Sequence, residues 1–119
     1  MRTLDLSEIG NVYIACGYTD MRRGINGLVG QIQQQFRLDA REQTVFLFCG
    51  KRSDRFKALF WDGDGFVLLY KRLEDGRYQW PRSQEEVRQL TEQQYRWLME
   101  GLSIVQPKAH RKVSAKDLV

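Results

Sequence analysis

Four short apolar stretches, each bounded by glycine or charged residues, predict β-strands. They are NVYIACG (11–17), TVFLFCG (44–50), RFKALFWD (55–62) and GFVLLYKRL (65–73). In the first stretch Val12, Ile14 and Cys16 alternate with Tyr13 and Ala15, which is the period of two that places side chains on opposite faces of a sheet. The sequence therefore predicts a sheet that begins close to the N-terminus.

Two Asp-Gly turns indicate how the later strands are connected. The DGDG sequence at 62–65 separates the third and fourth stretches, and Asp-Gly between apolar runs is a strong hairpin signal because glycine readily adopts positive φ. Asp75-Gly76 repeats the signal and predicts a fifth strand within EDGRYQW (74–80), which Pro81 ends. We therefore expect a mainly antiparallel meander.

Helical spacing predicts three helices around this sheet. The first follows the first strand, with Thr19 or Asp20 as its cap, and its apolar stripe consists of Met21, Ile25, Leu28, Val29, Ile32 and Phe36. A second begins at Ser83, with Glu86 completing a capping box. A third begins at Thr91 with Gln94 as its box partner, and its apolar face consists of Tyr95, Leu98, Met99 and Leu102, with a hydrophobic staple between Leu90 and Tyr95.

These elements together predict an α+β fold in a single domain over residues 1–105. A sheet of about five strands would be packed by an N-terminal helix and followed by C-terminal helices. Residues 106–119 are expected to form a basic, flexible tail, since KAHRKVSAK has no apolar periodicity.

Length and composition narrow the class of protein. A chain of 119 residues fits one domain, and its 42% hydrophobic content is typical of a globular protein. No apolar run approaches the roughly 18 residues that a membrane span needs. The opening MRTLDLSEIG carries acidic residues and does not read as an export leader. We expect a soluble, cytoplasmic protein without membrane contact.

The residues that usually carry enzyme chemistry are sparse. Cys16 and Cys49 each end a strand-like run, which favours buried thiols, although a disulfide stays open if those strands are neighbours. With His110 as the one histidine, no zinc set or Ser/His/Asp set can be assembled. Asp62 and Asp64 resemble the start of a calcium loop, but the later ligand positions are apolar, and turn formation explains them. We expect no cofactor, no metal and no catalysis.

Basic residues make a stronger case for a site. If the 55–73 hairpin folds back on itself, basic residues distant in the sequence meet at the end opposite the acidic turn. They are Lys51, Arg52, Arg55, Lys57, Lys71, Arg72 and Arg77. Tyr70, Tyr78 and Trp80 are close enough in the sequence to supply base stacking, so the cluster suits phosphate and base contacts. An ordinary solvated rim with the aromatic residues in the core is the alternative.

Further basic residues extend this hypothesis. Arg22 and Arg23 are expected in the first turn of the first helix, where the helix dipole disfavours cations unless an anion compensates. Pairing with a nearby carboxylate is the alternative. The tail contributes Lys108, Arg111 and Lys112, which attract phosphates without sequence preference, or else are only solvated.

Three segments together resemble a known family. They are NVYIACGYTDMRRGINGL (11–28), RSDRFKALFWDGDGFVLLYKRLEDGRYQWP (52–81) and LTEQQYRWLMEGL (90–102). They are similar to the TnpB accessory protein, the product of the second reading frame in the bacterial insertion sequence sixty-six family. The positions that match its motif blocks are Thr19, Asp20, Met21, Arg22, Asp54, Arg55, Lys57, Trp61, Asp62, Gly65, Lys71, Arg72, Leu73, Gly76 and Pro81. Where such proteins often carry an aromatic residue after the last glycine, this chain has Leu102-Ser103-Ile104.

The resemblance implies a part in transposition alongside a separate, larger transposase and a second accessory protein, and it implies no catalytic residue. Two functions remain open. The first is a non-catalytic DNA-binding module that acts at the ends of the insertion sequence. The second is an adaptor that bridges the transposase and the second accessory protein without touching DNA, with Trp61, Trp80 or Trp97 as exposed anchors. The oligomeric state is left open by the sequence.

Overall fold

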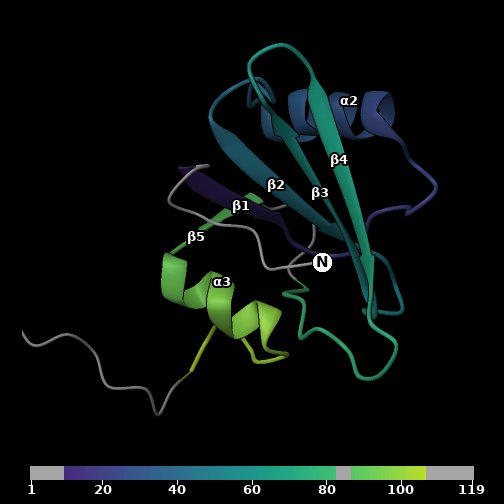
Figure 1. The fold of residues 1–119 in the computed structure, drawn as a ribbon, viewed down its shortest axis with the longest axis vertical. Helices are drawn as coiled ribbons and strands as arrows, with labels where there is room; N and C mark the ends of the chain where they lie inside the picture. The colour runs from purple at the N-terminus through teal and green to yellow at the C-terminus, as the bar shows by residue number, and fades with distance from the viewer. Residues whose placement is uncertain (1–9, 83–86, 107–119) are drawn as a thin grey trace, which may run out of the picture.

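The computed structural model describes residues 10–82 and 87–106. It contains, in chain order, β1 (Asn11–Ala15), α2 (Ile25–Phe36), β2 (Thr44–Cys49), β3 (Arg55–Trp61), β4 (Phe66–Arg72), β5 (Val87–Leu90) and α3 (Glu92–Met99). The five strands form one mixed sheet in the order β4-β3-β2-β1-β5 (Figure 1). The expected α+β class with a five-stranded sheet is confirmed, and four of the predicted strands have their expected places in the sequence.

The connections explain why only part of the sheet is a meander. β2, β3 and β4 pair antiparallel in succession, as expected from the hairpin signal. β1, however, pairs parallel with β2, and parallel neighbours need a long crossover, which α2 supplies. Figure 1 shows α2 at the upper end of the sheet in that view and α3 at the lower end.

The expected fifth strand after Asp75-Gly76 is wrong. Gly76 does adopt positive φ, but residues 73–82 form no strand and cross one end of the sheet instead. The true fifth strand is β5, which pairs antiparallel with β1. Val87–Leu90 was expected in a helix starting at Ser83, and residues 83–86 lie outside the described part of the chain. Backbone pairing with the open side of β1 outweighs the local capping signal here.

The first helix begins later than its sequence predicts. Gly24 occupies the N-cap position without a side-chain cap, so the expected cap at Thr19 or Asp20 is wrong. Arg22 and Arg23 therefore lie in the turn before α2 and not in its first helical turn. The cause is local pairing, because the Asp20 carboxylate accepts hydrogen bonds from both the backbone and the guanidinium of Arg22.

The last helix agrees with its sequence signals. The Thr91 side chain accepts from the Gln94 backbone N–H, and the Gln94 side-chain oxygen accepts from the Thr91 backbone N–H, so the capping box is confirmed. Leu90 and Tyr95 lie in one core cluster, as a staple requires. Leu102 does not share the buried face, because α3 ends at Met99 and the Leu102 side chain is 40% exposed.

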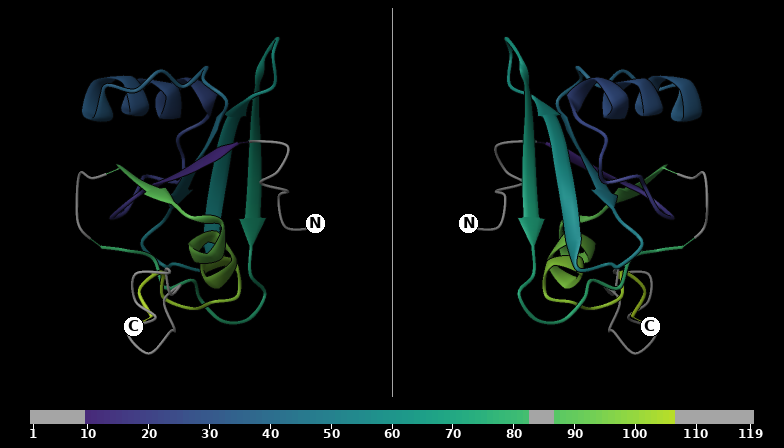
Figure 2. Two further views of the ribbon diagram at one scale, coloured as in Figure 1. Left: turned by 90° about the vertical axis from the view of Figure 1, so that its left-hand side faces the viewer. Right: turned by 90° about the vertical axis from the view of Figure 1, so that its right-hand side faces the viewer.

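Two clusters of buried residues fill the two faces of the sheet. One face packs beneath α2, with Phe46, Phe48 and Leu59 against Leu28 and Ile32. The other is covered by α3 and by the 73–82 segment; its buried members include Val12, Ile14, Val45, Leu47, Phe56, Tyr78, Trp80, Tyr95 and Leu98. All of β2 is buried because it lies in the middle of the sheet and under both layers (Figure 2).

Neither of the two described helices is long and apolar enough to cross a membrane. Both cysteines are buried, as the strand-like runs indicated. Burial raises the pKa of the Cys49 thiol from 9.0 to about 12, and burial likewise raises the pKa of the Tyr78 phenol from 10.0 to about 12. Both groups are therefore neutral in the folded protein over the ordinary pH range.

These two shifted groups predict a loss of stability in alkali. In the unfolded chain the thiol ionises near pH 9.0 and the phenol near pH 10.0, whereas the fold holds both neutral to about 12. The stabilisation from the neutral forms is complete below about pH 9 and is lost as pH rises toward 12. Urea unfolding at pH 8 and pH 11 should show a decrease of up to about 4 kcal/mol.

The matched control is the Cys49→Ala/Tyr78→Phe protein, which lacks both titrations. Its free energy of unfolding should fall less between pH 8 and pH 11, even if its value at pH 8 is lower. Equal pH dependence in the two proteins would show that other groups cause the loss.

Candidate functional site

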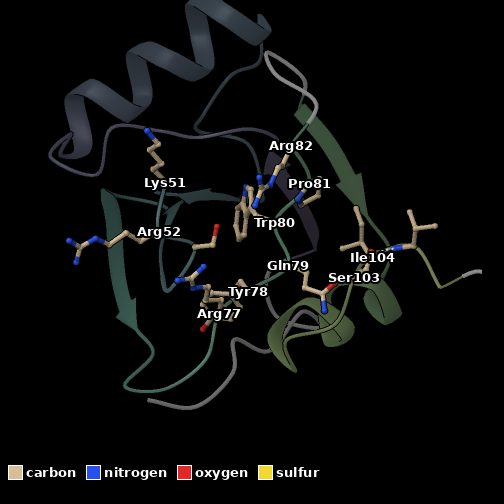
Figure 3. A pocket seen from close by; sticks show the side chains of 12 residues that line it. Lys51, Arg52, Arg77, Tyr78, Gln79, Trp80, Pro81, Arg82, Ser103 and Ile104 are labelled. Atoms are coloured by element: carbon tan, nitrogen blue, oxygen red, sulfur yellow. Dashed lines mark hydrogen bonds between the residues drawn. The ribbon is translucent and has the colours of Figure 1, made fainter.

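A pocket of about 580 Å³ lies at the end of the sheet where the 73–82 segment crosses. Its lining comes from the β2–β3 connection, from the segment after β4 and from the residues that follow α3. These are Lys51, Arg52, Ser53, Arg77, Tyr78, Gln79, Trp80, Pro81, Arg82, Ser103, Ile104 and Val105. Three segments that are far apart in the sequence thus build one concave surface (Figure 3).

The charges around this pocket all have one sign. Lys51, Arg52, Arg77 and Arg82 line it, and no aspartate or glutamate is among the lining residues. All four are exposed, and none forms a salt bridge within the described ranges 10–82 and 87–106. In Figure 3, Lys51 and Arg52 lie on one side of Trp80, and Arg82 lies on the other beside Pro81.

Backbone hydrogen bonds hold the two basic segments in place. Ser53 has a φ of 60°, a left-handed conformation, and its N–H donates to the Gly50 carbonyl at 3.1 Å. This tight turn presents Lys51 and Arg52. The N–H of Tyr78 donates to the Ser53 carbonyl at 2.7 Å, which ties the 73–82 segment to the same turn.

Alternation along the 73–82 segment separates its core residues from its surface residues. Tyr78 and Trp80 are buried, while Arg77 and Gln79 between them are exposed. The Trp80 indole N–H donates to the Ala15 carbonyl at 2.8 Å. The segment is therefore anchored by its aromatic residues and offers its polar residues to the pocket.

An exposed aromatic residue stands beside the pocket. The guanidinium of Arg82 lies 5.7 Å from the centre of the Tyr18 ring, within cation–π range, and the Tyr18 side chain is 40% exposed. Both residues were missed by the sequence analysis. No sequence signal pointed to Arg82, because residues 74–80 were expected to form a strand beside β4 and not to cross to the far end of the sheet.

A smaller pocket of about 320 Å³ continues the basic surface on the other side of the β2–β3 turn. It shares Lys51 and Arg52 with the first pocket and adds Arg22, Arg55 and Asp20. The segment before α2 is docked here, because the Thr19 N–H donates to the Cys49 carbonyl at 2.9 Å. A Cβ at Gly50 would stand 2.6 Å from the Met21 side chain, so only glycine permits this close approach.

The hairpin gathers basic residues as the sequence predicted, although many are already paired. Arg55 stands directly opposite Arg72 in the β3–β4 register. Arg55 donates twice to the Asp54 carboxylate, at 2.8 and 3.1 Å, and once to the Tyr70 hydroxyl. Arg72 pairs with Glu74 at 3.2 Å. Local carboxylates therefore offset much of this charge.

The same pairing occurs before α2. The forked hydrogen bond from Arg22 lowers the pKa of the Asp20 carboxyl to about 2, and in turn raises the pKa of Arg22. Arg23 donates to the Gln31 side chain at 2.7 Å. Intramolecular pairing, the alternative considered for Arg22, is thus observed.

Lys57 has a different environment. Its ammonium donates to the backbone carbonyls of Met21, at 2.7 Å, and Arg23, at 2.9 Å. It also lies 5.7 Å from the centre of the Tyr70 ring. These contacts hold the turn before α2 against the sheet. Lys71, on the neighbouring strand, belongs to the opposite face, because side chains alternate along β4.

The expected stacking residues need correction. Tyr78 and Trp80 are buried in the core and cannot offer a ring face, and Trp80 cannot be an exposed anchor for a protein either. Tyr70 remains available at 48% exposure, and Trp61 and Trp97 are half-buried. Lys108, Arg111 and Lys112 lie outside the described residues.

The acidic turn between β3 and β4 has a structural explanation. The Asp62 carboxylate accepts from the Gly65 N–H at 3.2 Å, and Gly63 has a φ of 108°. This confirms the prediction that the two aspartates belong to a hairpin turn. Within residues 10–82 and 87–106, no group of three or more His, Cys, Asp or Glu residues could hold a metal ion.

Comparison with known proteins gives one family. The family model described as IS66 Orf2 like protein matches residues 10–109. Two proteins of Sinorhizobium fredii (strain NBRC 101917 / NGR234), named uncharacterized protein y4hO and uncharacterized protein y4jC, are 33% and 32% identical over 91 residues. Each alignment covers 76% of this chain, and 79% and 78% of the respective relative. No solved structure matches the chain.

The contacts of Lys57 predict a structural role for that side chain. Lys57→Met keeps the aliphatic stem but removes the donor that two carbonyls share, so the free energy of unfolding should fall by about 1 to 3 kcal/mol. The measurement is urea unfolding, with Lys51→Met as the control because Lys51 is exposed and donates to no described residue. Equal stability of the two variants would contradict this role.

Proposed function

The chain belongs to the IS66 Orf2-like family of insertion-sequence accessory proteins, and from this premise we propose that it binds DNA without catalysing its cleavage. The DNA would be the ends of the insertion sequence, where a separate transposase acts. The DNA-binding surface we propose is the 580 Å³ pocket with its rim, and we call it the basic pocket.

The observation that carries the proposal is the gathering of four cations without a carboxylate in the same pocket. Several basic side chains elsewhere in residues 10–82 and 87–106 pair with acids, as Arg22, Arg55 and Arg72 do. Phosphate oxygens are the anions that such a group of lysine and arginine side chains recognises, and the arginine fork binds them with two donors. The arrangement supports contact with a nucleic-acid backbone.

The surroundings of the basic pocket favour an extended ligand over a small anion. The smaller pocket carries the surface past Lys51 and Arg52 to Arg22 and Arg55. The exposed Tyr18 ring beside Arg82 offers a face on which a base could stack. A strand of nucleic acid could therefore contact cations along its backbone and an aromatic ring at one end.

The test is a salt titration of DNA binding. Replacing Lys51 and Arg52 with alanine should weaken binding to a duplex that carries an insertion-sequence end, and should reduce the slope of log K against log salt by about 0.9 for each lost phosphate contact. Fluorescence anisotropy with an end duplex and a scrambled duplex measures both quantities. Arg77→Ala/Arg82→Ala should act in the same direction.

The matched control is Arg41→Ala/Arg96→Ala, which removes the same charge from exposed residues that pair with Asp39 and Glu92. It should change the affinity and the slope less than either pocket variant. If the control weakens binding equally, the effect is one of net charge and the basic pocket is not the site. If no variant changes binding, the proposal is wrong.

A second candidate function, an adaptor for the transposase and the second accessory protein, is favoured by a separate observation. Leu102 and Val105 are exposed apolar side chains, at 40% and 55%, in the segment after α3. Apolar residues of this kind serve as anchors when a partner covers them. This segment also reaches the basic pocket, because Ile104 and Val105 line it.

The adaptor function predicts co-purification that survives nuclease treatment. Leu102→Asp/Val105→Asp should abolish the capture of the transposase, because a buried, unpaired carboxylate would be left at the interface. Gln93→Asp, an exposed change on α3, is the control and should leave capture intact. If the unchanged protein, the double variant and the control all capture the transposase, or if none of them does, Leu102 and Val105 are not part of such an interface.

A further inference from the structure

The strand β4 forms one edge of the sheet, and it is unusually open for an edge. It pairs with β3 without interruption from Phe66 to Arg72, so no bulge bends it, and it contains no proline. The opposite edge strand, β5, has only four residues. Short strands, bulges, prolines and charged side chains are the usual means of preventing an edge from pairing, and β4 has only the charges of Lys71 and Arg72 at one end.

The phase of the β3–β4 ladder shows which backbone groups face outward. The N–H of Asp62 donates to the Gly65 carbonyl at 3.0 Å, and the N–H of Leu73 donates to the Asp54 carbonyl at 2.7 Å. In an antiparallel pair, bonded positions alternate with open ones. The backbone groups that point away from β3 are therefore those of Phe66, Leu68, Tyr70 and Arg72.

The side chains of this strand are poorly covered. Phe66, Val67, Leu68 and Leu69 are only half-buried, and Tyr70 is among the most exposed large hydrophobic residues of the described chain. No described strand pairs with the outer side of β4. The edge thus combines unsatisfied backbone groups with apolar side chains, which is the template that another strand extends.

The charges at its two ends indicate what that strand is. Asp62 and Asp64 precede β4, and Lys71 and Arg72 end it. A parallel copy of the strand would place like charges together, whereas an antiparallel copy places the acidic end of each beside the basic end of the other. We propose that β4 pairs antiparallel with β4 of a second copy of this chain, forming a continuous ten-stranded sheet.

One register satisfies both the backbone and the charges. With Leu68 on the two-fold axis, the outward positions of the two strands meet each other, as a hydrogen-bonded ladder requires. Phe66 then stands opposite Tyr70 of the second copy, and Asp64, in the turn before β4, comes beside its Arg72, which also pairs with Glu74 of its own chain. The aromatic pair and the ion pair occur twice, because the two-fold axis repeats each contact.

The experiment is a charge swap, measured by sedimentation velocity on the full chain without DNA. The unchanged protein should show a concentration-dependent dimer. Asp64→Lys should weaken dimerisation about tenfold, because each dimer would then hold two repulsive pairs. Arg72→Glu should do the same. The double variant, Asp64→Lys/Arg72→Glu, should restore the dimer, because the two charges are exchanged across the interface.

The swap discriminates well because Asp64 lies in the turn before β4 and Arg72 is the last residue of that strand, so the two cannot pair within one chain. Asp75→Lys, an exposed residue in the turn beyond β4, is the control and should leave the dimer intact. A monomer at all concentrations, an equal effect of Asp75→Lys, or a swap that fails to restore the dimer would each overturn the proposal.

Amide hydrogen exchange gives an independent readout of the same edge. Protection of the Phe66, Leu68 and Tyr70 amides should rise with protein concentration. Protection that is already complete in the monomer would mean that another part of the same chain covers the edge, and the proposal would fall. The inference does not depend on DNA binding, so its failure would leave the basic pocket untouched.

Discussion

The hydrogen bond from the Trp80 indole to the Ala15 carbonyl holds together the end of the sheet that carries the site. Ala15 is the last residue of β1, and Trp80 belongs to a segment that leaves the sheet after β4 at its far edge. Around this bond the Gly17 N–H donates to the Pro81 carbonyl at 2.7 Å, and the Tyr78 N–H reaches Ser53. The 73–82 segment can cross the sheet because these bonds satisfy its backbone without a neighbouring strand.

That crossing has consequences for both the core and the surface. It lays Tyr78 and Trp80 over the face shared with Tyr95 and Leu98, so the aromatic residues supply core volume that a small sheet would otherwise lack. Because residues on such an extended segment alternate, burial of the aromatic residues forces Arg77 outward, beside the turn that presents Lys51 and Arg52. The basic pocket is thus a product of how the core is closed.

The sequence predicted the features that depend on neighbouring residues. The Thr91 capping box, the Gly63 turn and the placement of Arg55 beside Arg72 all follow from contacts within a few residues or from one hairpin. It did not predict β5, because Val87–Leu90 becomes a strand only when the open side of β1 is available. It missed Arg82 for the same reason: the pocket depends on a crossing set by three hydrogen bonds between segments far apart in the sequence. Helical spacing also extended the first helix too far, since it could not show that Asp20 would bind Arg22.

The distribution of charge separates residues that serve the fold from those available to a ligand. Lys57 donates hydrogen bonds to backbone carbonyls, and Arg55 and Arg22 are held by carboxylates, so these cations contribute to local structure. Lys51, Arg52 and Arg77 have no such partner among the described residues, and placing like charges around one pocket is unfavourable for an isolated protein. Self-repulsion of this kind is relieved when an anion binds. A fold that holds Arg22, Arg55 and Lys57 in local bonds but leaves these pocket cations without one, beside hydrogen-bonded turns, is therefore better explained by a phosphate-bearing partner than by stability.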